Sequence, residues 1–499
     1  DMTRVKRIEV LNGAASSLYG SDAIGGVINI ITNEPKDVVA FSSNSSYTRK
    51  NQFSQGLNLD IAQGKIGSYT SYKYDHSDGW QNSRLTEDGE DIIETIAPLS
   101  LGYSSNNFSQ KFTYDATEQL SFYANGGYYN RGLERPVERE DITGGSKYNT
   151  TYEGYNWGAG AKYKLSKRNV IQFDYSGNNY ASRYKYLIEN SGYLPGQYAL
   201  TKLQKFHDAE LKGIFGFTTN STTVFGVDYR REVLRRPDSD LDKSVYTTSA
   251  YGQHEVKLWN HLTGVVGVRY DHHEQTGGRF TPKVAAMYNI GNFNVRATYA
   301  AGFRAPGIDE LYYHMFKKTM GTRATISLGD ENLDPERSNY YSINMEYRTN
   351  RFSASVTGYL NYVKNMVTSK STKFDDLPEA EQNQLREEFP EIGDLSSTKN
   401  LSVKNYFNFE KATVKGFEVN LNGNLFPGFT LAGNYTYAYG RGLNEGGEWQ
   451  NIERSIRHTA TITGNYTHSW SDYTLNLNLN GRLQSKVYYP GDADGNAPG

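Results

Sequence analysis

The sequence contains no cysteine, few tryptophans and no long hydrophobic run. Without thiols it forms no disulfide and offers no zinc-thiolate site, which suits an oxidising envelope compartment. No apolar segment approaches the roughly 20 residues of a transmembrane helix, and the mean hydropathy is -0.69. The 53 basic and 55 acidic residues nearly cancel, so the charge pattern expected of a nucleic-acid binder is missing.

Signals for export and catalysis are missing as well. The first ten residues have no basic start followed by an apolar stretch, so no secretory signal is visible. Neither G-x-S-x-G nor H-E-x-x-H is found. Gly20 and Gly25 have the glycine spacing of a phosphate loop, but Gly26 and Val27 follow where lysine and serine or threonine should stand. We therefore expect no enzyme.

Alternating apolar and polar residues dominate from about Val38 onward. Leu475, Leu477 and Leu479 alternate with asparagines, which places every second side chain on one face of a strand. Such segments run to about 10 residues or more, the length of a tilted strand that crosses a bilayer. The 41 tyrosines fit aromatic girdles at two membrane interfaces. The pattern predicts a lipid-facing β-barrel.

The expected connections alternate between short turns and long loops, as in outer-membrane barrels. Short turns are expected near residues 63–64, 115–117, 166–167, 219–220, 260–261, 291–292, 349–350, 427–428 and 469–471. Long loops are expected at 76–101, 129–154, 176–204, 302–337, 364–406 and 440–454.

This spacing gives about nineteen strands, and because bacterial barrels normally have an even number, we predict about 22 with roughly three beyond the last residue. The fold class is thus all-β, a transmembrane antiparallel barrel. A 19-stranded mitochondrial barrel also exists, so parity alone does not decide. A soluble propeller is less favoured, because no blade-length repeat is detectable.

The opening segment differs from the rest. It reads Arg7-Ile8-Glu9-Val10, then Leu18-Tyr19-Gly20, then Ala23-Ile24-Gly25-Gly26-Val27-Ile28-Asn29-Ile30. This segment resembles the end of the plug domain of TonB-dependent outer-membrane receptors, although Asn12 and Ala14 replace the usual arginine and proline. The resemblance implies that residues 1–36 are the C-terminal part of a plug in the lumen and that 37–499 are the barrel.

The resemblance also implies roles and partners. Arg7 and Glu9 should lie on a plug strand facing the polar barrel wall, with Gly20 in the motif and Gly25 and Gly26 permitting a tight bend. A plugged lumen implies driven uptake of a scarce substrate across the bacterial outer membrane, powered by the TonB complex of the inner membrane. We expect the lipid bilayer to surround the barrel, and we expect no nucleic-acid partner.

The loop at 302–337 points to a substrate. Phe303-Arg304-Ala305-Pro306 resembles one box of haem and haemoglobin receptors, and Asn332-Leu333 keeps only the end of the second box. His314 stands between them as a candidate axial ligand to haem iron, with Tyr312 and Tyr313 as oxygen donors and Met315 as an apolar contact. A packing or surface role for His314 fits the sequence equally well.

We therefore predict haem as the transported ligand, with no tightly bound cofactor. Cobalamin or a ferric siderophore is the alternative within transport, and an adhesion barrel without uptake is the competing class. Residues 374–392 suggest an amphipathic acidic helix over the barrel mouth, which would dock a surface lipoprotein or a host haem protein. A calcium site in the acidic loops at 87–91 and 492–496 is less favoured than an ordinary polar loop, because the residue spacing of a calcium-binding loop is incomplete there.

Overall fold

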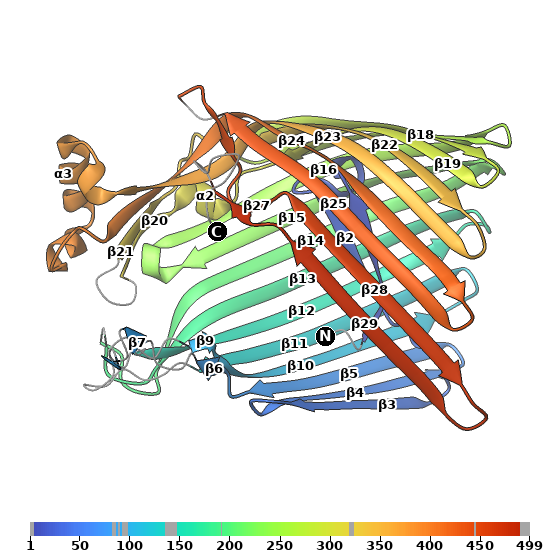
Figure 1. Cartoon of the computed structure of the whole chain (residues 1–499), viewed down its shortest axis with the longest axis horizontal. Coiled ribbons are helices and arrows are strands. Elements are labelled where there is room, and N and C mark those ends of the chain that lie inside the picture. Colours follow the sequence, from blue (N-terminus) through green and yellow to red (C-terminus); the bar gives the residue numbers. More distant parts are fainter. Residues whose placement is uncertain are drawn as a thin grey trace.

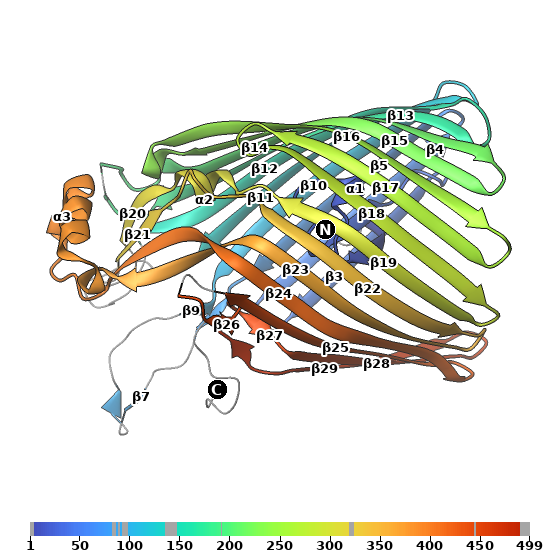
Figure 2. The same ribbon diagram turned by 90° about the horizontal axis from the view of Figure 1, so that it is seen from above.

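A single large antiparallel sheet closed into a barrel dominates the computed structural model (Figures 1 and 2). The structure describes residues 4–81, 86–87, 90–91, 98–134, 147–190, 192–318, 324–443 and 446–489. In this part of the chain the wall contains nineteen strands of nine or more residues: β3 (Ala40–Thr48), β4 (Gln52–Gln63), β5 (Ile66–Ser77), β10 (Gly102–Asp115), β11 (Leu120–Glu134), β12 (Tyr148–Lys164), β13 (Asn169–Tyr186), β14 (Tyr198–Thr218), β15 (Ser221–Arg236), β16 (Leu241–Leu258), β17 (Leu262–His273), β18 (Gly277–Ile290), β19 (Phe293–Arg304), β22 (Glu336–Arg348), β23 (Phe352–Lys373), β24 (Leu401–Phe426), β25 (Phe429–Leu443), β28 (His458–Ser469) and β29 (Thr474–Gln484). The predicted fold class is confirmed.

Helices within the described residues are few and short. None of them is long and apolar enough to cross a bilayer. The remaining elements are α1 (Ser16–Tyr19), α2 (Ile308–Tyr312), α3 (Glu379–Glu388), the 3-10 turns η2 (Pro237–Ser239), η3 (Phe374–Asp376) and η4 (Pro390–Asp394), and the short strands β1 (Val5–Asn12), β2 (Gly26–Thr32), β6 (Trp80–Gln81), β7 (Thr86–Glu87), β8 (Glu90–Asp91), β9 (Pro98–Ser100), β20 (His314–Lys318), β21 (Ala324–Leu328), β26 (Trp449–Asn451), β27 (Ser455–Ile456) and β30 (Val487–Tyr488).

The two ends of the barrel differ in their connections. One end has only tight turns, and all nine lie where the sequence predicts them. At the other end the strands run further than expected. Strand enters three of the predicted loops: β11 continues to Glu134 in 129–154, β13 to Tyr186 in 176–204 and β23 to Lys373 in 364–406, because these strands and their partners continue as ladders beyond the membrane-length segment. A bilayer-based length estimate stops at the hydrocarbon edge, whereas backbone pairing continues into water.

Alternation along each strand separates a lipid face from a lumen face. On β18, Phe280, Val284, Tyr288 and Ile290 are exposed on the outer wall, while Thr281 between them is buried inside. This is the arrangement of an outer-membrane barrel, apolar outside and polar inside.

The opening segment forms a small hairpin inside the barrel. β1 and β2 pair antiparallel, and they lie within the ring of barrel strands (Figures 1 and 2). α1 connects them and packs against β16, β17, β18 and β19. The lumen position predicted for this segment is confirmed, and the boundary at residue 36 stays a prediction.

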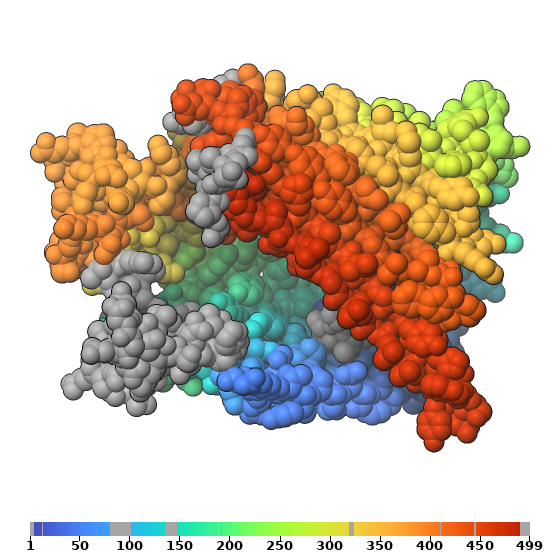
Figure 3. Space-filling view, viewed as in Figure 1, coloured from blue at the N-terminus to red at the C-terminus, as the bar shows by residue number. Residues whose placement is uncertain are grey.

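A compact cap extends beyond the barrel rim at the long-loop end (Figures 1 and 3). We use "cap" for β20, β21, η3, α3, η4 and the start of β24. β21 pairs in parallel with β24, and the cap has its own apolar core, which includes Ile326, Phe374, Leu385, Phe389 and Ile392. The predicted helix is present, but it spans only Glu379–Glu388, and Phe374 and Ile392 lie in the flanking 3-10 turns.

Candidate functional site

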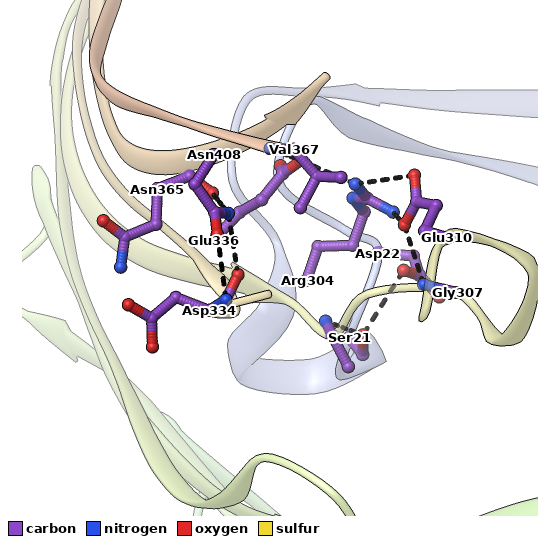
Figure 4. Close-up of polar contacts among 11 residues, drawn as sticks. Ser21, Asp22, Arg304, Gly307, Glu310, Asp334, Glu336, Asn365, Val367 and Asn408 are labelled. Carbon is purple, nitrogen blue, oxygen red and sulfur yellow. Dashed lines mark hydrogen bonds and ion pairs between the residues drawn. The ribbon is translucent and has the colours of Figure 1, made fainter. Parts of the chain in front are cut away.

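The end of the hairpin is fastened to the barrel where β19 passes into its long loop. We call this contact the plug junction, formed by residues 13–25 and 302–307. The Phe303 amide donates to Ser16 Oγ at 3.4 Å, the Asp22 amide donates to the Phe303 carbonyl at 3.3 Å, and the Ala305 amide donates to Ser21 Oγ at 3.2 Å. Figure 4 shows Ser21 and Asp22 beside this segment. Plug and loop therefore share one hydrogen-bonded seam.

A buried charge cluster supports the junction from the barrel wall. Arg269 pairs with Asp228 at 2.6 Å and with Asp271 at 2.7 Å, and the side chains of Arg269 and Asp271 are almost fully buried. Arg269 also donates to the Leu18 carbonyl at 3.5 Å. A buried guanidinium with two carboxylates is stable only in a fixed geometry. The cluster therefore holds residues 13–25, which we call the plug loop, in one position.

Glycine is required at two places in this loop. Gly20 has φ +77°, and a Cβ there would lie 2.9 Å from Arg269 Nη2. Gly13 has φ +84°, and its Cβ would collide with the Tyr340 ring. The sequence predicted a bend at Gly25 and Gly26: Gly26 has φ +148°, a conformation that favours glycine, whereas a Cβ at Gly25 would meet nothing within 4 Å. The close approaches to wall side chains are at Gly13, beside Tyr340, and at Gly20, beside Arg269.

Arg7 and Glu9 form an ion pair of 2.7 Å within β1, and both are about half exposed. Asn29 on β2 donates to Glu9 at 3.2 Å. The recorded partners of this pair are thus in the hairpin itself, whereas the sequence placed the two residues toward the barrel wall.

Arg304 connects the junction to the loop that follows. Its guanidinium pairs with Glu310 at 2.8 Å and Glu336 at 2.7 Å. Glu310 also accepts the Gly307 amide at 2.7 Å, and Glu336 accepts the Val367 amide at 2.9 Å (Figure 4). Arg304 thus fixes α2, β22 and β23 relative to one another.

Asn408 is a second residue that connects distant segments by hydrogen bonds, and it was not predicted from the sequence. Its side chain accepts the Asp334 amide at 2.9 Å and donates to the carbonyls of Asp334 at 3.0 Å and Asn365 at 2.7 Å (Figure 4). The partners lie 74 and 43 residues away in the chain, so no local pattern reveals them.

The proposed haem residues do not converge on one point. His314 lies in the cap, where its Nε2 is 3.3 Å from Glu388 and its ring stacks on Phe389 at 4.4 Å. The side chain is 54% exposed. A hydrogen bond from Gln384, with a further one from His314, lowers the pKa of Glu388. Among the described residues no group of three histidine or carboxylate side chains is placed to hold a metal.

The neighbouring candidates face the barrel wall. Tyr312 lies under Lys243, whose Nζ is 4.7 Å from the ring centre. Tyr313 accepts a hydrogen bond from Arg236, and burial raises the pKa of its hydroxyl. Met315 is 8% exposed and its sulfur lies 3.8 Å from the same arginine.

Phe303 is 2% exposed, so its ring does not line an open surface. The acidic loop 492–496 and residues 88–89 of the other acidic loop lie outside the described residues, so calcium there stays a prediction.

Comparisons with known proteins agree with this geometry. Residues 79–499 match the family described as "TonB dependent receptor-like, beta-barrel", and residues 1–27 match "TonB-dependent Receptor Plug Domain". The vitamin B12 transporter BtuB of Vibrio cholerae is 24% identical over 386 residues, covering 74% of this chain and 56% of the relative. The ferric enterobactin receptor PirA of Pseudomonas aeruginosa is 24% identical over 546 residues, covering 97% and 68%.

Solved structures show the same fold. The siderophore receptor PirA of Pseudomonas aeruginosa superimposes with a TM-score of 0.65 at 18% identity, over 96% of this chain and 78% of that one. A variant of the ferric enterobactin receptor PfeA from the same organism gives 0.71 at 15% identity, over 99% and 75%. The chain spans little more than half of the first curated relative, 56% of its length.

Proposed function

The chain belongs to the TonB-dependent receptor family of bacterial outer-membrane β-barrels, and from that premise we propose that it takes up a ferric siderophore by TonB-dependent active transport. In this mechanism the lumen holds a plug, and the inner-membrane TonB complex supplies the force that displaces it. The receptor performs no covalent catalysis; it binds, releases and gates.

One observation carries the proposal: the plug junction. The end of the plug is bound to β19 and its loop by three hydrogen bonds and backed by the Arg269 cluster. A plug fastened to the wall in this way supports a mechanism in which passage of a large solute requires work on the plug.

The relatives and the contacts of His314 support the choice of substrate class. The named relatives are receptors for ferric enterobactin and vitamin B12, which favours the siderophore or cobalamin alternative over haem. The sequence argument for haem depended on His314, whose imidazole is already paired with Glu388 and stacked on Phe389. We therefore rank the ferric siderophore first and cobalamin second.

Uptake by cells tests the proposal. A deletion strain carrying the full-length receptor is offered an iron-55 siderophore or labelled cobalamin, and uptake of the label is measured. Growth of the same strain is measured with haemin as the iron source. We expect siderophore uptake that disappears with a protonophore and in a strain lacking TonB. Uptake that persists without TonB would contradict active transport. Growth on haemin that is lost with His314→Ala would restore the haem hypothesis and the axial-ligand role.

The surface lipoprotein and the host haem protein remain predicted partners. Their docking site would be the cap, which carries the acidic helix α3 and projects furthest from the rim. Recovery of the same lipoprotein with the receptor, lost when residues 374–400 are replaced by a short turn, would support that partner.

A further inference from the structure

Aromatic girdles do not explain all of the tyrosines. Girdle residues face lipid, as Tyr155, Trp157 and Tyr163 do on the outer wall of β12. A second group faces the lumen instead. We call it the tyrosine terrace, and it comprises Tyr103, Tyr148, Tyr152, Tyr180, Tyr184 and Tyr186.

Register places the terrace on the inner wall. Asn125 and Asn156 line a cavity of about 200 Å³ together with the hairpin residues Arg4 and Asn33, so their side of β11 and β12 is the lumen side. Tyr148 and Tyr152 lie eight and four positions from Asn156, and the ladder of β12 with β13 runs without a bulge. Even spacing keeps side chains on one face.

The remaining members follow from the same ladders. Asn178 pairs with Asn156, and Tyr180, Tyr184 and Tyr186 lie at even spacing from it on β13. On β10, Tyr103 lies eight positions from Lys111, which lines the same cavity and pairs with Glu34 at 3.6 Å. The terrace therefore covers the inner wall near the long-loop end.

Two pairs of terrace rings lie face to face, whereas Tyr186 meets Tyr148 edge-on at 6.0 Å. Tyr148 and Tyr184 stack at 3.7 Å, and Tyr152 and Tyr180 lie nearly parallel at 6.1 Å. Most are only partly buried, so ring surface remains accessible from the lumen. Rigid aromatic surface next to water is unusual in a polar lumen and indicates a binding surface.

Arg131 adds a positive charge to the terrace. Its guanidinium lies 4.3 Å from the centre of the Tyr103 ring, on the same lumen face of β11 as Asn125. Among the described residues its Nε has no hydrogen-bond partner. The side chain as a whole is only partly buried, so its positive charge is accessible from the lumen to an anionic ligand.

We propose that the tyrosine terrace and Arg131 form the entry site for a chelate whose iron-binding groups are aromatic and anionic, that is, a catecholate. Flat catechol rings stack on tyrosine faces, and their iron-bound oxygens carry the negative charge that a guanidinium recognises. This inference rests on the proposed uptake of a ferric siderophore and narrows its chemical class.

Binding to the purified full-length receptor tests the terrace separately from transport. The probes are iron(III) tris(2,3-dihydroxybenzoate) and an iron(III) trihydroxamate, which has no aromatic ring, with affinity measured by calorimetry. We expect the catecholate to bind more tightly, and Tyr152→Leu with Tyr180→Leu to weaken it by about tenfold, as the loss of two stacking contacts implies. The trihydroxamate affinity should not change.

Two variants make the result specific. Tyr155→Leu, on the same strand but facing lipid, should leave catecholate affinity unchanged. Tyr152→Phe with Tyr180→Phe keeps the rings and should retain it, and heat-modified gel mobility confirms that each barrel is folded. Equal affinity for both probes, or equal losses with leucine and phenylalanine, would overturn the terrace proposal. If TonB-dependent uptake persists in that case, the proposed function stands; if neither chelate binds or enters cells, the proposed function itself fails.

Discussion

At the scale of single residues, the plug loop is held by contacts that leave no room for substitution. Gly20 adopts a left-handed conformation and lies directly against Arg269, whose charge is balanced by Asp228 and Asp271. A side chain at this position would strain the backbone and push the guanidinium away from its carboxylates. The positions of these three charges therefore depend on a residue without a Cβ at position 20.

Replacing Gly20 with alanine should loosen the plug junction. The left-handed backbone costs about 1–2 kcal/mol for an ordinary residue, so we expect hydrogen exchange of the amides in residues 13–25 to become roughly tenfold faster, the factor that about 1.4 kcal/mol represents. Gly25→Ala is the matched control, because its Cβ would meet nothing. Equal exchange in the two variants would show that Arg269 does not restrain the loop.

Arg304→Lys should loosen the loop without removing charge. A lysine cannot reach Glu310 and Glu336 with the same planar fork, and leaving one carboxylate unpaired costs about 1–3 kcal/mol. The Gly307 and Val367 amides, which donate to these two carboxylates, should therefore exchange faster. Arg351→Lys, in an exposed short turn, serves as the control. Unchanged protection at both amides would rule out the connecting role of Arg304.

At the scale of elements, the cap behaves as a small unit with its own core. Phe374, Leu385, Phe389 and Ile392 are almost fully buried against β21 and β24, although the cap projects beyond the barrel rim (Figure 3). Its stability should therefore depend on this core and not on the barrel ladders.

Leu385→Ala should unfold the cap locally while the barrel stays intact. A buried leucine truncated to alanine costs about 2–5 kcal/mol, which is a large share of what so small a core supplies. We expect rapid proteolysis between residues 374 and 400 with unchanged heat-modified mobility of the barrel. Glu387→Ala on the exposed side of α3 should have no such effect. Loss of the folded barrel in Leu385→Ala would mean that cap and barrel unfold together.

Elements were predictable where the signal is local. The alternation in β29 and the nine short turns identify strands and their ends, because side chains on a strand have a period of two and turns need particular residues. The reach of β23 and β24 past the membrane was not predictable, since it depends on pairing between the two strands. Ser16 and Phe303 lie 287 residues apart, so the junction is visible only in three dimensions.

At the scale of the whole molecule, plug and barrel wall meet at the start of one long loop. Ser21 contacts Ala305, and Arg304 next to it fixes α2 and β22. A chelate bound by this loop would therefore lie next to the seam that has to open under the proposed transport. In the proposed mechanism this arrangement would couple substrate binding to movement of the plug through neighbouring residues.

Covalent closure of that seam should separate binding from transport. The sequence has no cysteine, so Ser21→Cys with Ala305→Cys introduces a single pair at a site where the Ala305 amide lies 3.2 Å from Ser21 Oγ. Oxidised cells should bind labelled siderophore at normal levels but take up none, and a membrane-permeant reductant should restore uptake, because the plug then moves again. Ser71→Cys with Ser109→Cys joins two paired barrel strands and leaves the plug free, so uptake should continue after oxidation. Continued uptake with the Ser21–Ala305 crosslink formed would mean that the substrate passes without displacement of this part of the plug.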